Sequence, residues 1–464
     1  MNFDKINSVY LIGIGGIGMS AIARYFNLLG KYVAGYDRTS TSLTNELTAE
    51  NITIHFEDNI DLIPERVKKE PRNSLLVIYT PAIPADMLEL NYFLNNGYEV
   101  YKRSAVLGEI TKNSFTIAVA GTHGKTTTSS MITHLLKYSG IDCTAFLGGI
   151  SKNYHSNFIT GKGKINNKPV VVVEADEFDR SFLTLHPDIG IITSMDADHL
   201  DIYQQSAELE NAYRKFASQM SKDGILIYKK SLPVGNVNAK KIKYSITGEA
   251  EYSAFDINIK NHEYHFNAIT PAGIIENLTI GLPGIHNVEN SVAALAVGIE
   301  LNINKQKVRE GLASYAGVYR RFDYQIKSKN LVFIDDYAHH PEELRACITS
   351  VKQLYPDKKI TGIFQPHLFS RTKDFADDFA KALSLLDGLI LMEIYPAREL
   401  PIEGVTSSML LDKIELPDKI LCSKQQVLDE INRRNVEVLV TLGAGDIDQL
   451  VQPIKNILLK KVKE

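Results

Sequence analysis

Short apolar runs alternate along the chain with segments in which apolar residues recur at helical spacing. Runs that are apolar at every position, rather than at every second one, are typical of strands covered on both faces. Strands that alternate with helical patterns indicate parallel sheets with crossover helices, and hence an α/β fold. The expected strands are residues 8–14, 31–37, 74–80, 98–103, 115–121, 169–176, 188–194, 331–337, 359–365, 388–395 and 436–445.

A less regular region, roughly residues 224–281, separates the second group of runs from the third. Its segments 250–260 and 263–270 alternate polar and apolar residues, so we expect antiparallel strands appended to a central domain. A length of 464 residues suggests about three domains. The expected divisions are 1–112, 113–318 and 319–464.

Composition narrows the class of protein without naming a reaction. Hydrophobic residues make up 44% and charged residues 23%, as in ordinary globular proteins. A net charge of −4 gives no reason to expect a nucleic-acid partner. The 3 cysteines are far apart, which fits a reducing cytoplasm and argues against a disulfide framework. We expect neither a signal peptide nor membrane insertion, because no apolar run approaches the length of a span.

A glycine-rich turn follows the first expected strand. Gly13, Gly15 and Gly18 form G-x-G-x-x-G before a helical pattern, and Asp37 ends the next strand. This arrangement is the dinucleotide fingerprint, in which a diphosphate lies at a helix N-terminus and an acid lies near the ribose. The motif indicates a diphosphate and leaves open NAD, a UDP-sugar, or a tight turn without ligand.

A second turn, in AGTHGKTTT, ends like a P-loop but lacks its first glycine, since Val119 stands at that position. A buried-strand pattern precedes it and a helical pattern follows Lys125. In this context backbone N–H groups would face a phosphate chain, Lys125 would reach the β- and γ-phosphates, and Thr126 would ligate Mg²⁺. The alternative is a strand-to-helix turn without ligand.

Two further expected strands end in acidic turns. One carries Glu174, and the other runs into Asp198 and His199. If both strands pair with residues 115–121, these side chains converge with Lys125 at one sheet edge, where α/β proteins bind ligands. Thr126, Glu174 and His199 would then hold one or two Mg²⁺ ions beside ATP. Taken singly, Glu174 reads as a solvated acid and His199 as a structural histidine.

With these motifs the chain resembles the Mur ligases, the ATP-dependent amide-forming enzymes of peptidoglycan precursor synthesis. The resemblance runs through GIGGIGMSAIA, AGTHGKTTT, EADEFDRSF, DADHLDIY, GIHNVENSVAA, RRFDY, DDYAHHP, FQPHLFSRT, YPARELP and GAGDID. It implies a Rossmann-like domain for a UDP-sugar, a central P-loop-type ATPase domain, and a Rossmann-like C-terminal domain for an amino acid. The implied reaction joins L-alanine to UDP-N-acetylmuramate through an acyl phosphate.

The resemblance also distributes the candidate site residues. For the UDP-sugar they are Gly13, Gly15, Gly16, Ile17, Gly18, Asp37, Thr80, Pro81 and Ala82. For ATP they are Gly121, Thr122, His123, Gly124, Lys125, Thr126, Thr127, His286, Asn287, Asn290, Arg321 and Asp336. The catalytic candidates are Lys125, Glu174, His199, His339 and Arg371, of which Arg371 would clamp a carboxylate or phosphate.

The alternatives at these positions are structural. His339 could serve a helix start, since Pro341 with two glutamates follows, and His286 with Asn287 could cap a helix. Two departures from the family pattern stand out. Leu368 replaces an arginine of some members, and Arg214, beside Lys215, stands where others carry a carbamylated lysine.

The expected partners are therefore ATP, Mg²⁺, UDP-N-acetylmuramate and L-alanine, in a cytoplasmic monomer or weak homodimer whose domains close during turnover. A ligase that adds a tripeptide to the same UDP-sugar is the nearest rival. An NAD(P)-dependent oxidoreductase would account for the first glycine turn alone, and a non-catalytic nucleotide-gated module is the third alternative.

Overall fold

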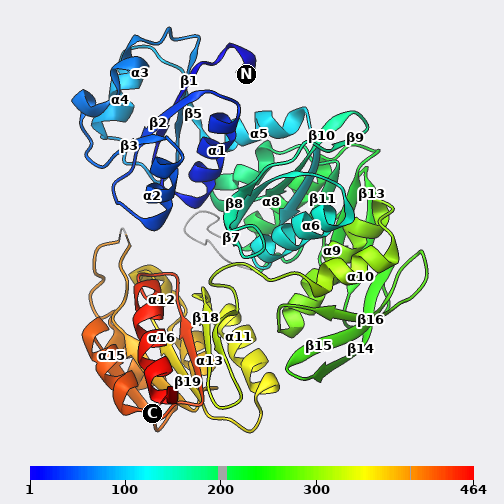
Figure 1. Ribbon diagram of the computed structural model, residues 1–464, viewed down its shortest axis with the longest axis vertical. Helices are drawn as coiled ribbons and strands as arrows, with labels where there is room; N and C mark the ends of the chain where they lie inside the picture. Colours follow the sequence, from blue (N-terminus) through cyan, green and yellow to red (C-terminus); the bar gives the residue numbers. More distant parts are fainter. Residues whose placement is uncertain (197–205, 398, 464) are drawn as a thin grey trace. The chain divides into compact units, whose positions relative to one another are not determined.

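The computed structural model describes residues 1–196, 206–397 and 399–463 (Figure 1). The described chain contains three α/β sheets and divides into two compact units. One unit comprises Met1–Phe255, Ala268–Glu276 and Asn290–Tyr315, and the other comprises Asp256–Asn267, Asn277–Glu289 and Ala316–Glu464. The three-domain α/β architecture with mostly parallel sheets is confirmed, while the domain boundaries stay a prediction.

The first sheet is entirely parallel, with strand order β3-β2-β1-β4-β5. Its strands are β1 (Ser8–Ile12), β2 (Tyr32–Tyr36), β3 (Thr53–His55), β4 (Leu75–Tyr79) and β5 (Val100–Lys102). Its helices are α1 (Ile17–Leu28), α2 (Ser42–Ala49), α3 (Glu65–Lys69), α4 (Leu88–Asn95) and α5 (Arg103–Lys112), with short 3₁₀ turns at Phe3–Lys5 and Ile60–Leu62.

Side chains of β1 alternate between two apolar cores. Val9 and Leu11 belong to the core under α1, α2 and α5, whereas Tyr10 and Ile12 belong to the core under α3 and α4. Because helices cover both faces, the strand carries apolar residues at nearly every position, which explains the continuous runs in the sequence.

The second sheet has strand order β16-β15-β14-β13-β12-β11-β6-β10-β7-β8, with β9 paired to β10. Its strands are β6 (Phe115–Ala120), β7 (Thr144–Ser151), β8 (Ser156–Ile159), β9 (Lys164–Ile165), β10 (Lys168–Glu174), β11 (Ile189–Ile192), β12 (Ile225–Lys229), β13 (Lys240–Ser245), β14 (Tyr252–Lys260), β15 (Glu263–Ile269) and β16 (Ile275–Ile280). Its helices are α6 (Lys125–Ser139), α8 (Ser206–Ser218), α9 (Ile285–Glu300) and α10 (Lys305–Ala313), and a 3₁₀ segment spans Phe178–Thr184.

Strand β6 lies between β10 and β11 and is parallel to both. The condition on which the predicted convergence of Lys125 with the acidic strand ends depended is therefore met. The region 224–281 is mixed, since β12 and β13 extend the parallel part of the sheet. Asn261 and His262 join β14 to β15 with φ angles of 51° and 60°, the pattern of a two-residue hairpin turn between antiparallel strands.

One apolar core runs through the first two sheets. It joins Val9 and Leu11 of β1 to Phe146 of β7 and Phe158 of β8. Tyr25 of α1 connects the two parts, because its ring centroid lies 5.6 Å from that of Phe146 and 6.2 Å from that of Phe158. Helix α1 is thus shared between the first domain and the central domain.

The third sheet has strand order β17-β18-β22-β19-β20-β21, and β17 is its antiparallel edge strand. Its strands are β17 (Asp323–Lys327), β18 (Val332–Asp336), β19 (Ile360–Phe364), β20 (Gly388–Met392), β21 (Lys419–Cys422) and β22 (Val438–Leu442). Its helices are α11 (Pro341–Leu354), α12 (Phe369–Asp374), α13 (Ala376–Leu383), α14 (Ser407–Lys413), α15 (Lys424–Arg433) and α16 (Asp448–Lys463). Helices α15 and α16 pack on one face, through side chains such as Val427 and Ile454 (Figure 1).

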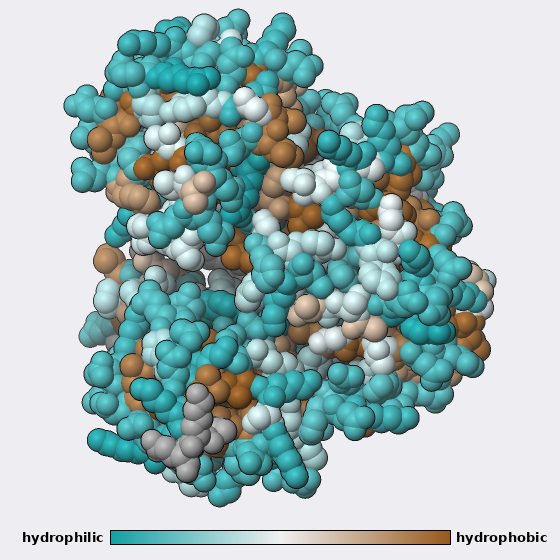
Figure 2. Space-filling model, viewed as in Figure 1, coloured by the Kyte–Doolittle hydropathy of each residue, from teal (hydrophilic) through white to brown (hydrophobic). Residues whose placement is uncertain are grey.

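Hydrophilic side chains cover most of the face shown in Figure 2. Single apolar side chains are nevertheless exposed, such as Leu400 and Leu28. Among the described residues, no helix combines the length and the apolar character needed to cross a membrane.

Candidate active site

The phosphate turn connects β6 to α6 and depends on two glycines with positive φ angles. Gly121 has a φ angle of 137° and Gly124 one of 83°. A Cβ atom on Gly121 would lie 2.1 Å from Oγ1 of Thr193, and one on Gly124 would lie 2.7 Å from Oδ1 of Asn290. Both distances are too short for any other residue, so the turn packs closely against the end of β11 and against α9. This packing places Asn290, a predicted ATP residue, beside the phosphate turn.

Lys125, the first residue of α6, is held by the turn and by a buried acid. Its Nζ donates to the carbonyl oxygens of Gly121 and Thr122 at 2.7 and 3.2 Å. The same atom lies 2.9 and 2.8 Å from the two carboxylate oxygens of Glu177, a residue without solvent exposure. Burial lowers the pKa of Lys125, but the carboxylates of Glu177, Asp176 and Glu174 outweigh it and raise that pKa above its ordinary value. Lys125 is therefore a cation at neutral pH.

Glu177 is the residue at this edge that the candidate site set omits. Burial raises the pKa of its carboxyl, while Lys125 opposes that shift. The parallel register of β10 with β6, in which Glu174 lies opposite Val119, brings the turn after β10 to the same sheet edge as the phosphate turn. The acidic segment EADEFD was visible in the sequence, but nothing in it distinguishes the acid that faces the lysine.

Glu174 ends β10 at the same edge and accepts a hydrogen bond from the backbone N–H of Gly148 at 2.9 Å. Thr126, in the first turn of α6, is buried. The hydroxyl of Thr126 and the carboxylate of Glu174 are hard oxygen donors of the kind that suits Mg²⁺. The third predicted ligand, His199, lies outside the described residues, so the metal site as a whole stays a prediction.

His123 and Thr122 connect the phosphate turn to the segment after β11. The backbone N–H of His123 donates to Oγ of Ser194 at 2.8 Å, and Oγ1 of Thr122 donates to the carbonyl of Asp196 at 2.8 Å. Nε2 of His123 lies 3.9 Å from a carboxylate oxygen of Asp196. His123 thus lies at the turn itself. Thr127 follows in the first turn of α6 and is buried.

The first glycine turn connects β1 to α1, as the fingerprint predicts. Gly13 has a φ angle of 86°, and a Cβ atom on it would lie 2.6 Å from Cγ2 of Thr80. The turn after β4, which begins with Thr80 and continues through Pro81 and Ala82, therefore lies against the glycine turn, as expected for one binding site. Gly16 is the N-cap of α1, and Ile17 is its first residue.

Asp37 has a structural function in this turn. Its Oδ2 atom accepts a hydrogen bond from the backbone N–H of Gly15 at 2.7 Å. A Cβ atom on Gly15 would lie 2.8 Å from the same oxygen, so this glycine allows the carboxylate to approach. The acid expected near a ribose therefore also shapes the glycine turn.

In the other unit, Asp336 and His339 follow β18. The Asp336 carboxylate accepts hydrogen bonds from the N–H groups of Phe322 and Ala338 at 2.7 and 2.8 Å, and burial raises its pKa to about 6. Burial lowers the pKa of His339 to about 4, so its ring is neutral at pH 7. The structural alternative for His339 was helix capping. The N-cap of α11 is instead its neighbour His340.

Arg321 lies near two of the predicted nucleotide residues of this unit, Asp336 and His286. Its guanidinium lies 5.0 Å from the ring centroid of Tyr337, and its positive charge opposes the larger rise that burial causes in the pKa of Asp336. Burial, followed by the charge of Arg321, lowers the pKa of His286 to about 4. Asn287 is buried and donates from Nδ2 to the carbonyl of Pro283 at 2.6 Å, which fastens the start of α9. Because the amide donates here, this contact differs from the helix cap that was the structural alternative, in which the side chain accepts from a backbone N–H.

Burial lowers the pKa values of His339 and His367 to about 4, and the charge of Arg371, which lies on α12, adds to both shifts. His367 stacks on Tyr395 with ring centroids 5.8 Å apart and lies 6.0 Å from the ring of His339. The candidate set omitted His367, although FQPHLFSRT contains it. Leu368, at the position of the missing arginine, has a φ angle of 71°, which a leucine rarely adopts.

Arg214 of α8 is held by neighbouring groups. Its guanidinium donates to the carbonyl of Pro233, to Asn211 and to Glu210 at 3.0, 3.1 and 3.0 Å. These contacts agree with direct replacement of the family lysine by arginine, which stays a prediction.

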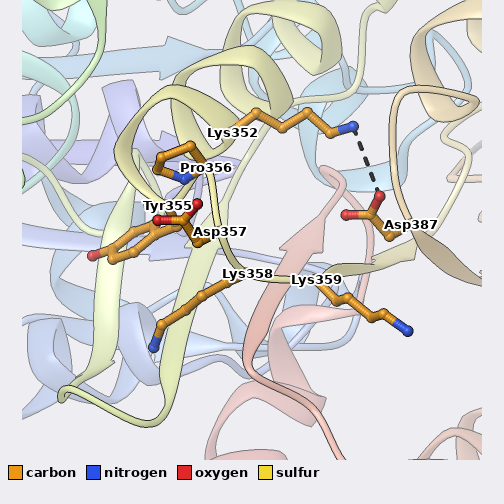
Figure 3. Close-up of a pocket in the computed structure, with 7 residues that line it drawn as sticks. All are labelled: Lys352, Tyr355, Pro356, Asp357, Lys358, Lys359 and Asp387. Atoms are coloured by element: carbon orange, nitrogen blue, oxygen red, sulfur yellow. Dashed lines mark ion pairs between the residues drawn. The ribbon is translucent and has the colours of Figure 1, made fainter.

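A cavity of about 430 Å³ lies apart from these residues (Figure 3). Lys352, Tyr355, Lys359 and Asp387 contribute to its lining. Lys359 and Asp387 directly precede β19 and β20, so the cavity lies where these strands begin. Ligands of α/β sheets bind where strands end, and the cavity is therefore not part of the candidate site.

Three family models match successive parts of the chain. They are the Mur ligase family, catalytic domain, over residues 8–115, the Mur ligase middle domain over residues 119–298, and the Mur ligase, glutamate ligase domain, over residues 320–447. The α/β fold, the two glycine turns and the acidic strand edge agree with these matches. The chain belongs to the Mur ligase family.

Its relatives point to a particular member of that class. The chain is 50% identical over 462 residues to a UDP-N-acetylmuramate–L-alanine ligase of Flavobacterium johnsoniae, with 100% of each chain covered. It is 49% identical over 467 residues to the enzyme of the same name from Parabacteroides distasonis, again with 100% of each chain covered. A solved UDP-N-acetylmuramate-alanine ligase of Thermotoga maritima matches with a TM-score of 0.81 and 27% identity, covering 98% of this chain and 99% of that one. A murein peptide ligase of Psychrobacter arcticus shares the fold, with a TM-score of 0.72 and 21% identity, covering 97% of this chain and 98% of that one.

Proposed function

We propose that the protein joins L-alanine to the carboxylate of UDP-N-acetylmuramate at the expense of ATP, in peptidoglycan precursor synthesis. The observation that carries the proposal is the identity of about half of all positions, over the full length, to relatives with that activity in their names. The phosphate turn supports it, since Lys125 is partly buried and charged at a sheet edge where an ATP phosphate chain would lie.

The proposed reaction has two steps. The substrate carboxylate attacks the γ-phosphate of ATP, which gives an acyl phosphate and ADP. The amine of L-alanine then attacks the acyl carbon and phosphate leaves. Two anions approach each other in the first step, so catalysis depends on positive charge that is already in place. Lys125 supplies such a charge, and the glycines of the turn let backbone N–H groups approach the phosphates.

Mg²⁺ is proposed as the metal cofactor, with Thr126, Glu174 and His199 as its ligands. When bound, the ion neutralises charge on the phosphates and orients them for in-line transfer. The donors present support this choice, because hydroxyl and carboxylate oxygens suit a hard cation.

His339 and Arg371 are proposed for the amino-acid step. Burial keeps His339 neutral at pH 7, so its ring can accept a hydrogen bond from the incoming amine, while a pKa of about 4 makes it a weak base. A guanidinium binds a carboxylate through two parallel hydrogen bonds, which suits Arg371 to the L-alanine carboxylate. We further propose a cytoplasmic monomer or weak homodimer.

The test is phosphate release with UDP-N-acetylmuramate, ATP and Mg²⁺. L-alanine, L-serine, glycine and the tripeptide are offered in turn, and L-alanine should support the fastest turnover. Turnover with the tripeptide alone would assign the chain to the recycling reaction instead. Consumption of NADH with a carbonyl substrate, without ADP formation, would overturn both assignments.

A further inference from the structure

Arg103 begins α5 in the first domain, in a segment without a recognised nucleotide motif. Its side chain is 22% exposed, so most of it is buried. Among the residues that the structure describes, its guanidinium has one acidic partner, Asp176, at the rather long distance of 3.4 Å. A largely buried guanidinium with five N–H donors is thus far from saturated.

The guanidinium lies directly on the first glycine turn. A Cβ atom on Gly18 would lie 2.0 Å from Nη1 of Arg103, 3.1 Å from Cζ and 3.3 Å from Cδ. The third glycine of the fingerprint usually allows a helix to pack closely on a strand. Here Gly18 instead leaves room for an arginine against the first turn of α1.

Gly18 and Arg103 therefore combine two features that attract phosphate. The N-terminus of α1 presents unpaired N–H groups and the positive end of a helix dipole. Its first turn contains no acidic residue, and the guanidinium adds a full positive charge beside it. Asp176 of the central domain pairs with that guanidinium. Asp176 belongs to the acidic turn, two residues after Glu174 and directly before Glu177.

We propose that Arg103 binds the diphosphate of the UDP-sugar and, through Asp176, fixes the sugar nucleotide relative to the acidic turn of the ATP-binding domain. This inference rests on the proposed function and adds to it a binding residue of the sugar nucleotide. A bidentate guanidinium–phosphate contact positions the diphosphate, and the ion pair with Asp176 orients the guanidinium.

The experiment is isothermal titration of the full chain with UDP-N-acetylmuramate, UDP and UMP. Arg103→Gln should weaken binding of UDP and of the UDP-sugar by about 10- to 100-fold, the range for a lost hydrogen bond to a charged group. Arg103→Lys should restore part of the loss, because it keeps the charge without the fork of donors. The matched control is Arg66→Gln, an exposed arginine of the same domain that lies over the ring of Tyr32 and should leave binding unchanged.

Gly18→Ala gives a supporting test, because Gly18 is itself one of the glycines of the expected UDP-sugar site. Alanine suits a helix, but its Cβ atom must displace the Arg103 guanidinium, so UDP binding should weaken while thermal stability is retained. KM for ATP should stay within about twofold of the wild-type value in the Arg103 variants. If Arg103 only supported the acidic turn, its substitution would raise KM for ATP.

The outcomes separate two failures. If the wild-type protein binds no UDP-sugar, the proposed function is wrong. If the wild type binds it and Arg103→Gln binds it equally well, only the assignment of Arg103 is wrong.

Discussion

The ion pair between Lys125 and Glu177 makes a quantitative prediction for Glu177→Ala. Both oxygens of the carboxylate lie within 2.9 Å of Nζ, and the exposed fractions of the two side chains are 12% for Lys125 and 0% for Glu177. Removing one partner of a buried pair leaves an uncompensated charge and typically costs about 3–5 kcal/mol. The carbonyls of Gly121 and Thr122 remain as acceptors for Nζ, so we expect the lower half of that range. Glu177→Gln retains an acceptor oxygen and should cost about 1.5–3 kcal/mol.

The assay is urea unfolding of the full chain. The free energy is taken from the unfolding transition of the unit that contains the phosphate turn. A chain of this size need not unfold in two states, so the comparison is between variants within that one transition. Glu208→Ala is the matched control, because Glu208 pairs with Arg180 across 3.3 Å at the surface of the same unit. Its loss should cost less than about 1 kcal/mol.

ATP provides a second reading of the same pair. Its phosphates can supply the negative charge that Glu177→Ala removes, so Mg-ATP should raise the melting temperature of this variant more than that of the wild type. The reasoning is refuted if Glu177→Ala unfolds within about 1 kcal/mol of the Glu208→Ala control, since a buried pair cannot then be worth what its geometry implies.

Three further changes have defined expected outcomes. Lys125→Met should lower kcat for ADP formation by about 10²- to 10³-fold, the effect of losing one preorganised donor at a developing charge, as stopped assays of ADP would show. Asn157→Leu should cost about 1–3 kcal/mol in urea unfolding, because Nη1 of Arg24 and the carbonyl of Ile17 lose a partner at 2.5 and 2.6 Å in a fully buried place. For His134, burial lowers the pKa from 6.5 to about 4, so the unfolded chain binds a proton that the folded chain excludes. The free energy of unfolding should therefore fall by up to about 3 kcal/mol as pH decreases from 6.5 to 4, and His134→Gln should flatten that dependence in melts across this range.

Each of these outcomes has a contradicting result. If Lys125→Met forms ADP at the wild-type rate, Lys125 does not take part in the proposed phosphoryl transfer. Unchanged unfolding of Asn157→Leu would mean that water replaces the lost amide. An identical pH dependence in wild type and His134→Gln would assign the acid sensitivity to other groups.

The sheet architecture was predictable because a strand that is buried on both faces has apolar residues at consecutive positions of the sequence. Strands β1, β6, β10 and β22 are apolar at almost every position, and each is followed by a turn with glycine or acidic residues. Sequence reasoning could also state that Lys125 and Glu174 converge, provided that β6 and β10 are neighbours, and the sheet meets that condition.

Individual partners were harder to predict, because they depend on single-residue register. Glu177 rather than Glu174 meets Lys125, and His340 rather than its neighbour His339 caps α11. Arg103 carries no motif at all, and its relation to Gly18 appears only when the starts of α1 and α5 are seen together. Such contacts join residues distant in sequence, so no local pattern records them.

Helix α1 lies on a core that the first two domains share, with Asn157 of β8 hydrogen bonded to Ile17 and Ser20 in its first turn. This sharing limits how the chain can be cut and recombined. A fragment that ends after α5 would leave Tyr25 and its neighbours without Phe146 and Phe158, and would present an apolar face to water. Chimaeras with a relative should therefore exchange the first two domains together, because exchange of the first domain alone separates residues that must be compatible.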